Sequence, residues 1–425
     1  MSSRQNLFLL LALSFIIYSQ SFSQRKVDIK KLRSNFVLED IKKDYYQNII
    51  SEIKSTFKTD INKQSVASWK RAFSNAESLF LFEEDVLSAI RKSLDIPLDK
   101  YIKLQRATLE IAYSTENNTF EKRVNEIFLS TKDKTSYAIA TNYLLKANYL
   151  DRVRSFYINN LKEKFISWEN NPILKSLLFD LSNSKKFDNM PSMVELLQHS
   201  FQKGKTIIYS LYRKDRNFPG ITIIKNPDGS FVKNDDGTIF NIPQLAISFS
   251  NLPGYIPNGN TPEGIYSIIG KYISPTQTIG PTPNVLVRSP FEVSPEIFFH
   301  NKNEYENFKK EDYTNLLPKT WQNYFPIYQS YYAGKYGRRL IIMHGSTDDL
   351  DYYKKKSYYP LSPTRGCLSS KEIWNSLNGK CVESDQAKLI NAFYLTKQLK
   401  GFLVVVEIDD KNRPVTIEEI NKILP

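Results

Sequence analysis

The sequence predicts a multidomain chain of the α plus mainly-β class, in which an all-helical region precedes a β-rich region. Between about residues 28 and 200, apolar side chains recur at the three- and four-residue spacing of amphipathic helices. From Lys205 onward, short β-rich runs alternate with glycine, proline, asparagine and aspartate. A length of 425 residues with 41% apolar side chains is enough for two or three domains with their own cores.

The first 23 residues have the pattern of an export signal. Arg4 precedes the apolar run NLFLLLALSFIIYS, and the small residues Ser21 and Ser23 follow it. Because this run is shorter than the ~20 residues of a membrane-spanning helix, we expect a signal peptide at 1–23 that is cleaved from the mature protein. The protein would then be exported to the periplasm or cell envelope, with a retained membrane anchor as the alternative.

The chain is basic, with a formal net charge of +13. Loss of residues 1–23 removes only Arg4 and leaves a charge of +12. Such a charge suits a polyanionic neighbour such as cell wall, a membrane surface or nucleic acid, although a well-solvated basic surface explains it equally simply. Export makes nucleic acid the least favoured of these partners, and we predict none.

Residues 24–204 are expected to form a helical domain, plausibly of stacked helical hairpins, whose role the sequence does not reveal. Trp69, Phe73 and Ala76 show the helical spacing, and segments such as DIPLDK and STENNTF separate units of helix length. The stretch PSMVELLQHSF predicts a helix with a capping box, because Ser192 stands three positions before Glu195. This domain is also the part of the chain that we expect to bind protein partners.

Residues 205–410 are expected to form the β-rich domain. Its predicted strands are TIIYSLY, GITIIK, LAISFS, GIYSIIG, NVLVRS, EIFFH, RRLIIMH and GFLVVVEI. Two helices are expected near its end, at SSKEIWNSL directly after Cys367 and at DQAKLINAFYLTKQL. The charged residues 411–425 are expected to form a tail.

Elimination leaves Cys367 and His344 as the candidate catalytic pair. Three histidines are too few for most hydrolytic zinc sites, so we predict no metal. No G-x-S-x-G nucleophile elbow and no phosphate-binding glycine loop is present. A thiolate at the N-terminus of a helix has a lowered pKa, and Arg365 nearby would add positive potential. The backbone N–H groups of Arg365, Gly366 and Cys367 can converge as an oxyanion hole, where losing one donor costs roughly 3–4 kcal/mol.

The residues around this pair resemble the L,D-transpeptidase (YkuD-type) catalytic domain. That family has a strand ending in His-Gly, then Ser/Thr-His-Gly-Cys and an aliphatic residue, with a Thr-Pro-x-Gly stretch upstream. The corresponding residues are Thr261, Pro262 and Gly264, then His344-Gly345, then Thr364-Arg365-Gly366-Cys367-Leu368. The resemblance covers about residues 205–410 and implies a YkuD-like β-sandwich. Arg365 stands where the family usually has histidine, Ser369 stands where it has arginine, and the loop between His344 and Cys367 is longer than is common.

The resemblance implies acyl transfer on peptidoglycan without a metal or organic cofactor. Cys367 would attack a donor tetrapeptide stem with His344 as base, and the amine of an acceptor stem would resolve the thioester into a 3-3 crosslink. Gly345 and Ser346 would orient the histidine, and the substrate would contact Thr364 and Arg365. Tyr332, in SYYAGKYG, would line the groove.

Two other functions fit the sequence. With water as acceptor, the same pair would make the protein an L,D-carboxypeptidase or peptidoglycan hydrolase. Alternatively, Cys367 and Cys381 would form a disulfide in a non-catalytic wall-binding protein. Such a bridge contributes about 3 kcal/mol in the chain-entropy model.

Overall fold

The computed structural model describes residues 26–97, 100–115, 118–147, 151–183, 186–301 and 307–424. The predicted signal peptide at 1–23 lies outside the described residues. Among the described helices, none combines the length and the apolar character that crossing a membrane requires. The coarse prediction of a helical region followed by a β-rich region is confirmed, and the β-region is one large mixed sheet.

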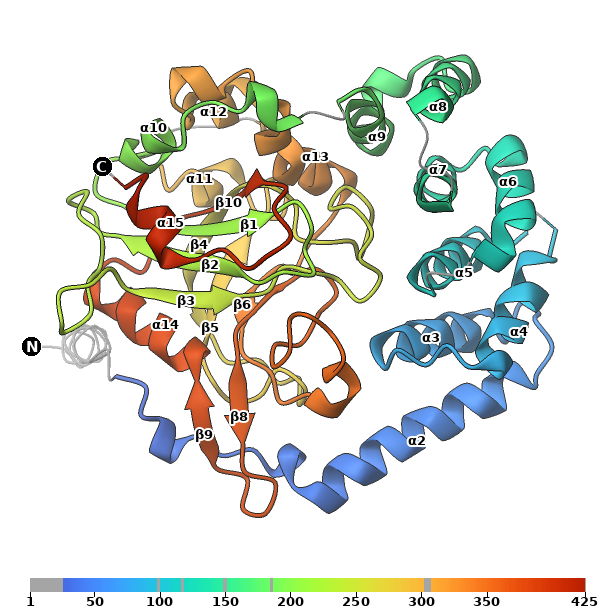
Figure 1. The fold of residues 1–425 in the computed structure, drawn as a ribbon, viewed down its shortest axis with the longest axis horizontal. Coiled ribbons are helices and arrows are strands. Elements are labelled where there is room, and N and C mark those ends of the chain that lie inside the picture. The colour runs from blue at the N-terminus through green and yellow to red at the C-terminus, as the bar shows by residue number, and fades with distance from the viewer. Residues whose placement is uncertain are drawn as a thin grey trace, which may run out of the picture.

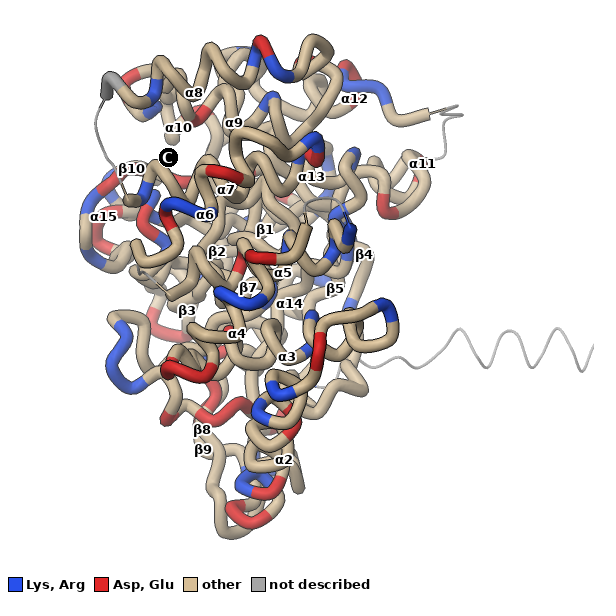
Figure 2. The backbone as a smooth tube through the Cα atoms, turned by 90° about the vertical axis from the view of Figure 1, so that its right-hand side faces the viewer, with Lys and Arg blue, Asp and Glu red and all other residues tan. Residues whose placement is uncertain are grey.

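The helical region forms an arc beside the sheet (Figure 1). Trp69, Phe73 and Ala76 are buried on one face of their helix, as their spacing predicts, because this face packs on the next helices of the arc. Lysines and acidic residues both occur along the first of these helices, Glu39–Phe57 (Figure 2). The helices of the arc are α2 (Glu39–Phe57), α3 (Val66–Ser78), α4 (Glu84–Leu94), α5 (Ile102–Ser114), α6 (Glu121–Ser130), α7 (Lys134–Ala147), α8 (Asp151–Lys164) and α9 (Pro172–Ser182).

The β-region contains a mixed sheet in the order β3-β2-β1-β10-β4-β5-β6-β7. Two neighbouring pairs, β1 with β10 and β6 with β7, are parallel, and the other pairs are antiparallel. Leu245, just after β3, exchanges two backbone hydrogen bonds of 2.8 Å with Ser369 in β7, so the two edges of the sheet meet and nearly close it into a barrel. The strands are β1 (Thr206–Arg213), β2 (Gly220–Lys225), β3 (Asn241–Gln244), β4 (Gly264–Tyr272), β5 (Asn284–Arg288), β6 (Met343–His344), β7 (Leu368–Ser369) and β10 (Gly401–Asp409), and a separate hairpin holds β8 (Glu372–Trp374) and β9 (Cys381–Ser384).

Both faces of the sheet are covered, which explains why successive residues of the central strands β1 and β10 are buried on both sides. Phe402 and Val404 of β10 face one core, and Leu403 and Val405 face the other, because successive side chains point to opposite sides of a strand. Helix α14 (Asp385–Leu395) covers the second face. The first face carries α10 (Met193–Gln198), α11 (Pro295–Phe298), α12 (Lys310–Asn315), α13 (Gln329–Tyr336) and α15 (Ile417–Asn421).

The helical arc and the segment before it touch the β-region in several places, so the expected boundary at residue 204 does not separate two independent cores. Residues 26–38 lie along the β8–β9 hairpin, where the backbone N–H of Cys381 donates to Leu32 O at 3.2 Å. Tyr255, from the loop before β4, is buried in the helical core. At the far end, Phe179 of α9 stacks on Phe325, with ring centroids 4.4 Å apart.

Five local predictions differ from the structure. The run LAISFS forms only isolated bridges at Leu245 and Ser248 rather than a strand. The segment after Cys367 forms β7 and the β8–β9 hairpin rather than a helix, because its residues pair with strands distant in sequence. The run EIFFH forms helix α11 rather than a strand. No capping hydrogen bond forms at Ser192, and the Glu195 carboxylate accepts from Thr320 instead. The expected tail folds back as α15, whose Ile420 is fully buried.

Candidate active site

Cys367 and His344 line the same cavity of about 330 Å³. His344 ends β6, and Cys367 stands directly before β7. The parallel register of these strands places His344 opposite Ser369, two residues after Cys367. Strand pairing therefore brings together the two residues that the sequence singled out.

His344 is positioned to act as a base. It is only 5% exposed, and its Nδ1 lies 2.5 Å from the carbonyl oxygen of Gly345. Since a carbonyl oxygen only accepts, Nδ1 carries the proton and Nε2 is left with its lone pair. Burial lowers the pKa of His344 to about 4, although the hydrogen bond to Gly345 opposes this shift. The imidazole is therefore neutral at neutral pH.

Cys367 rests as a thiol, contrary to the sequence-based expectation of a lowered pKa. No helix follows the residue, and burial raises the pKa of its thiol. The backbone N–H of Ile342 and the guanidinium of Arg338 oppose this effect and favour the thiolate. The Sγ atom lies 3.4 Å from Leu340 O, to which the thiol donates. The pair is thus a neutral thiol beside a neutral base, and proton transfer belongs to the reaction itself.

Gly345 lies between His344 and Glu372: its carbonyl accepts from the imidazole, and its Cα packs against the Glu372 carboxyl. A Cβ atom at this position would lie 2.1 Å from Cδ of Glu372, a buried side chain whose Oε1 accepts from Ser384 Oγ at 2.5 Å. Burial raises the pKa of Glu372 to about 7. Ser346 does not contact the imidazole, because its Oγ donates to Asp348 Oδ2 at 2.9 Å. Of the two predicted orienting residues, Gly345 therefore contacts His344 directly.

The loop before Cys367 is a tight turn organised by Thr364. Its Oγ1 accepts from the backbone N–H of Gly366 at 3.0 Å and donates to Cys367 O at 3.0 Å. Gly366 has φ of +96°, which favours glycine. Because the N–H of Gly366 is engaged, the expected three-donor oxyanion hole reduces to the N–H groups of Arg365 and Cys367. Neither of these two N–H groups donates to a protein acceptor within the described part of the chain.

Arg365 offers an exposed positive charge to the cavity. Its guanidinium forms no hydrogen bond or ion pair with another described residue. Two buried carboxyls from the helical arc, Glu77 of α3 and Glu110 of α5, lie within its electrostatic reach. Burial raises the pKa of Glu77 to about 7 and that of Glu110 well above its usual value, so these carboxyls neutralise the arginine only in part.

The helical arc supplies the opposite wall of the cavity, which the sequence did not predict. The long loop between His344 and Cys367 is held by this wall: Tyr46 OH accepts from the backbone N–H of Asp349 at 3.1 Å, and Tyr353 OH donates to Ser78 O at 3.2 Å. This loop therefore contacts the helices through Asp349 and Tyr353. The wall residues are Tyr45, Tyr46 and Ile49 of α2 with Asn75, Ser78 and Leu79 at α3.

The remaining candidate residues lie elsewhere. Tyr332 of α13 packs in the core with its ring 5.4 Å from that of Phe325, and it is not among the residues that line the cavity of Cys367. Cys381 in β9 and Cys367 are both free thiols. His199 donates from Nε2 to Leu316 O at 2.9 Å, which fits its predicted structural role.

The cavity therefore combines a thiol, a neutral imidazole with a free Nε2, two backbone N–H groups and an exposed guanidinium. These are the groups that acyl transfer through a thioester requires: a nucleophile, a base, oxyanion donors and an anchor for a substrate carboxylate. No protein-family model, curated protein or solved structure matches this chain, so the family resemblance depends on its motifs alone.

Proposed function

We propose that this protein is an exported cysteine acyltransferase of the L,D-transpeptidase type, which acts on peptidoglycan stem peptides and forms 3-3 crosslinks. The observation that carries the proposal is the shared cavity of Cys367 and His344, in which the Gly345 carbonyl holds the imidazole as a neutral base. Under this proposal the near-closed sheet is a variant of the YkuD-like β-sandwich that the motifs imply.

In the proposed reaction, His344 Nε2 takes the thiol proton as Sγ of Cys367 attacks the carbonyl carbon at the L-centre of the donor's diamino acid. The N–H groups of Arg365 and Cys367 stabilise the oxyanion. The C–N bond to the terminal D-alanine then breaks, and His344 returns the proton to the leaving amine. This leaves a thioester on Cys367. The side-chain amine of an acceptor stem attacks the thioester, forms the crosslink and releases the thiol.

Arg365 is proposed to bind a carboxylate of the donor stem, in place of the family's usual contacts. Its guanidinium is exposed in the cavity, and the two carboxyls within its electrostatic reach, Glu77 and Glu110, have raised pKa values. A peptide that enters the cavity also meets Tyr45 and Tyr46 of α2. The helical arc would therefore take part in substrate selection.

The experiment compares the wild type with Cys367→Ala. Each is incubated with purified disaccharide-tetrapeptide, and the products are analysed by mass spectrometry. We expect dimers that lack one D-alanine from the wild type only. Loss of D-alanine without dimers would replace transfer by hydrolysis, and equal product from both proteins would reject Cys367 as the nucleophile. The alternative of a disulfide-bridged binding protein is disfavoured by the two free thiols.

A further inference from the structure

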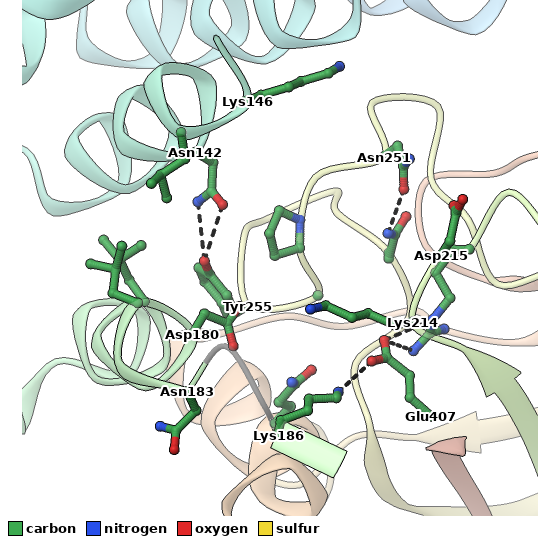
Figure 3. A pocket seen from close by; sticks show the side chains of 18 of the residues that line it. Asn142, Lys146, Asp180, Asn183, Lys186, Lys214, Asp215, Asn251, Tyr255 and Glu407 are labelled. Atoms are coloured by element: carbon green, nitrogen blue, oxygen red, sulfur yellow. Dashed lines mark hydrogen bonds and ion pairs between the residues drawn. The ribbon is translucent and has the colours of Figure 1, made fainter. Parts of the chain in front are cut away.

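A second cavity, of about 450 Å³, lies between the helical arc and the β-region and does not include Cys367 or His344. Its walls come from α5, α7, α8 and α9 on one side, and from the loop after β1, the loop before β4 and β10 on the other (Figure 3). Its volume falls within the range of small-molecule sites. Thr261 belongs to this wall, and its Oγ1 donates to Gly366 O at 3.1 Å, next to Cys367.

The floor of this cavity is a buried ion network that leaves one donor unused. Lys186 pairs with Glu263, at 2.6 Å, and with Glu407. Arg216 donates to Glu407 Oε1 from Nε and Nη2, at 3.0 and 2.9 Å. The Arg216 side chain is only 2% exposed, and its Nη1 is buried without any partner among the described residues. A buried guanidinium with an unpaired N–H group is costly unless an acceptor completes it.

Lys214 adds a positive charge that the protein does not neutralise by contact. Its ammonium extends into the space between the helices and the β-region (Figure 3). Lys214 is exposed, and in the described part of the chain its Nζ forms no hydrogen bond or ion pair. Together with Arg216, it gives one side of the cavity the character of a carboxylate site.

The other side of the cavity carries acceptors. Asp180 of α9 lies beside Tyr255 (Figure 3), and burial raises the pKa of its carboxyl to about 6 while the nearby Lys186 and Lys214 oppose that shift. Asn142 of α7 donates to Tyr255 OH at 3.2 Å. Asp180 therefore gives this side of the cavity a carboxyl group that can accept hydrogen bonds from an ammonium group.

Charges of both signs in one enclosed space select for a ligand that has both. A zwitterionic peptide matches the lysine with its carboxylate and the aspartate with its ammonium. Leu177 and Pro253 provide apolar surface for a short side chain.

We propose that this cavity binds a short zwitterionic peptide, with its carboxylate at Lys214 and Arg216 and its ammonium at Asp180. The wall stem peptide, whose diamino acid carries both groups, is the expected source, and only this choice of source rests on the proposed function. Through Thr261, an occupied cavity borders the turn that holds Cys367.

The test is calorimetric titration of the full chain carrying Cys367→Ala, which removes the thiol and so separates binding from acyl transfer. The probes are the stem tripeptide with a meso-diaminopimelate end, the dipeptide L-Ala-L-Ala, and the same dipeptide N-acetylated and C-amidated. We expect both zwitterionic probes to bind and the blocked dipeptide not to bind. Tighter binding of the tripeptide would assign the source to the wall, and equal binding would assign it to free peptides.

The variants locate the site. Lys214→Ala is expected to weaken the binding of the zwitterionic dipeptide about tenfold, because a charge-assisted contact is lost. Lys233→Ala, at an exposed lysine outside the cavity, should change it less than twofold. Asp180→Asn should weaken the binding of L-Ala-L-Ala about tenfold. It should leave unchanged the affinity for N-acetyl-L-Ala-L-Ala, which keeps its carboxylate but has no ammonium group. Absence of binding at millimolar concentration, binding of the blocked dipeptide, or equal effects of the two lysine variants would overturn the proposal.

Discussion

Replacing Gly345 by alanine tests whether the packing behind His344 sets the geometry of the pair. The new Cβ would lie 2.1 Å from Cδ and 2.2 Å from Oε2 of Glu372, whereas carbon atoms in ordinary contact are about 3.5–4.0 Å apart. The carboxyl would have to move by more than about 1 Å, which breaks its hydrogen bond to Ser384. Overpacking of this kind costs about 1–3 kcal/mol, and an unsatisfied buried group adds a similar amount. We therefore expect Gly345→Ala to lower the free energy of unfolding by about 3 kcal/mol.

The control is the same substitution in a Glu372→Ala background, where the obstructing carboxyl is gone. The Oε2 atom of Glu372 has no partner among the described residues, and Oε1 accepts from Ser384; removing the carboxyl leaves the Ser384 hydroxyl without this acceptor, a loss that is the same with glycine or alanine at residue 345. In this background we expect Gly345→Ala to cost less than about 1 kcal/mol, which gives a coupling of about 2 kcal/mol in the double-mutant cycle. Urea unfolding of the four proteins, compared at constant m-value, measures it. Equal costs in both backgrounds would refute the steric explanation.

Three further predictions follow from the cavity. Alkylation of Cys367 by iodoacetamide, measured by mass spectrometry against pH, should have a higher midpoint than that of an unstructured cysteine peptide, because burial raises the pKa of the thiol; a midpoint below that of the peptide would contradict this. The rate of acyl transfer should fall at acidic pH only below about pH 5, because the imidazole of His344 has a pKa of about 4 and is a neutral base above that range. A fall with a midpoint at pH 6.5 would show that burial does not lower the pKa of His344. Arg365→Ala should raise KM about tenfold with kcat within twofold, and Arg365→Lys should restore part of the loss, whereas a change in kcat alone would exclude a role in substrate binding.

Local sequence patterns predicted the parts of the fold that local contacts decide. The spacing of Trp69, Phe73 and Ala76 predicted a buried helix face, and the apolar run GFLVVVEI predicted the central strand β10. The helix predicted after Cys367 is wrong because Ile373 pairs with Glu383 in the β8–β9 hairpin, and this tertiary pairing outweighs the helical pattern of the segment. Helix α15 was missed although its signal was present, since Thr416 and Glu419 form a capping box.

For the candidate site, the sequence predicted the reacting residues but not their surroundings. His344 and Cys367 could be found from their glycine-flanked motifs. Tyr46 and Ser78 could not, because nothing in a sequence connects residues so far apart from the loop that they hold. The neutral thiol was missed for the same reason: burial sets its pKa, and burial depends on the whole fold.

The contact of residues 26–38 with the far end of the chain has a consequence for when the protein reaches its final form. The backbone N–H of Val27 donates to Asn391 Oδ1 at 2.7 Å, across a separation of 364 residues. Contacts of such long range form late, because the entropy of closing a long loop must be overcome first. During synthesis, the hairpin partner of Leu32 is made only after most of the chain, so the segment beside it must wait. Helix α14 and residues 27–32 therefore complete the structure together, and a chain cut short before residue 380 leaves residues 27–32 without these partners.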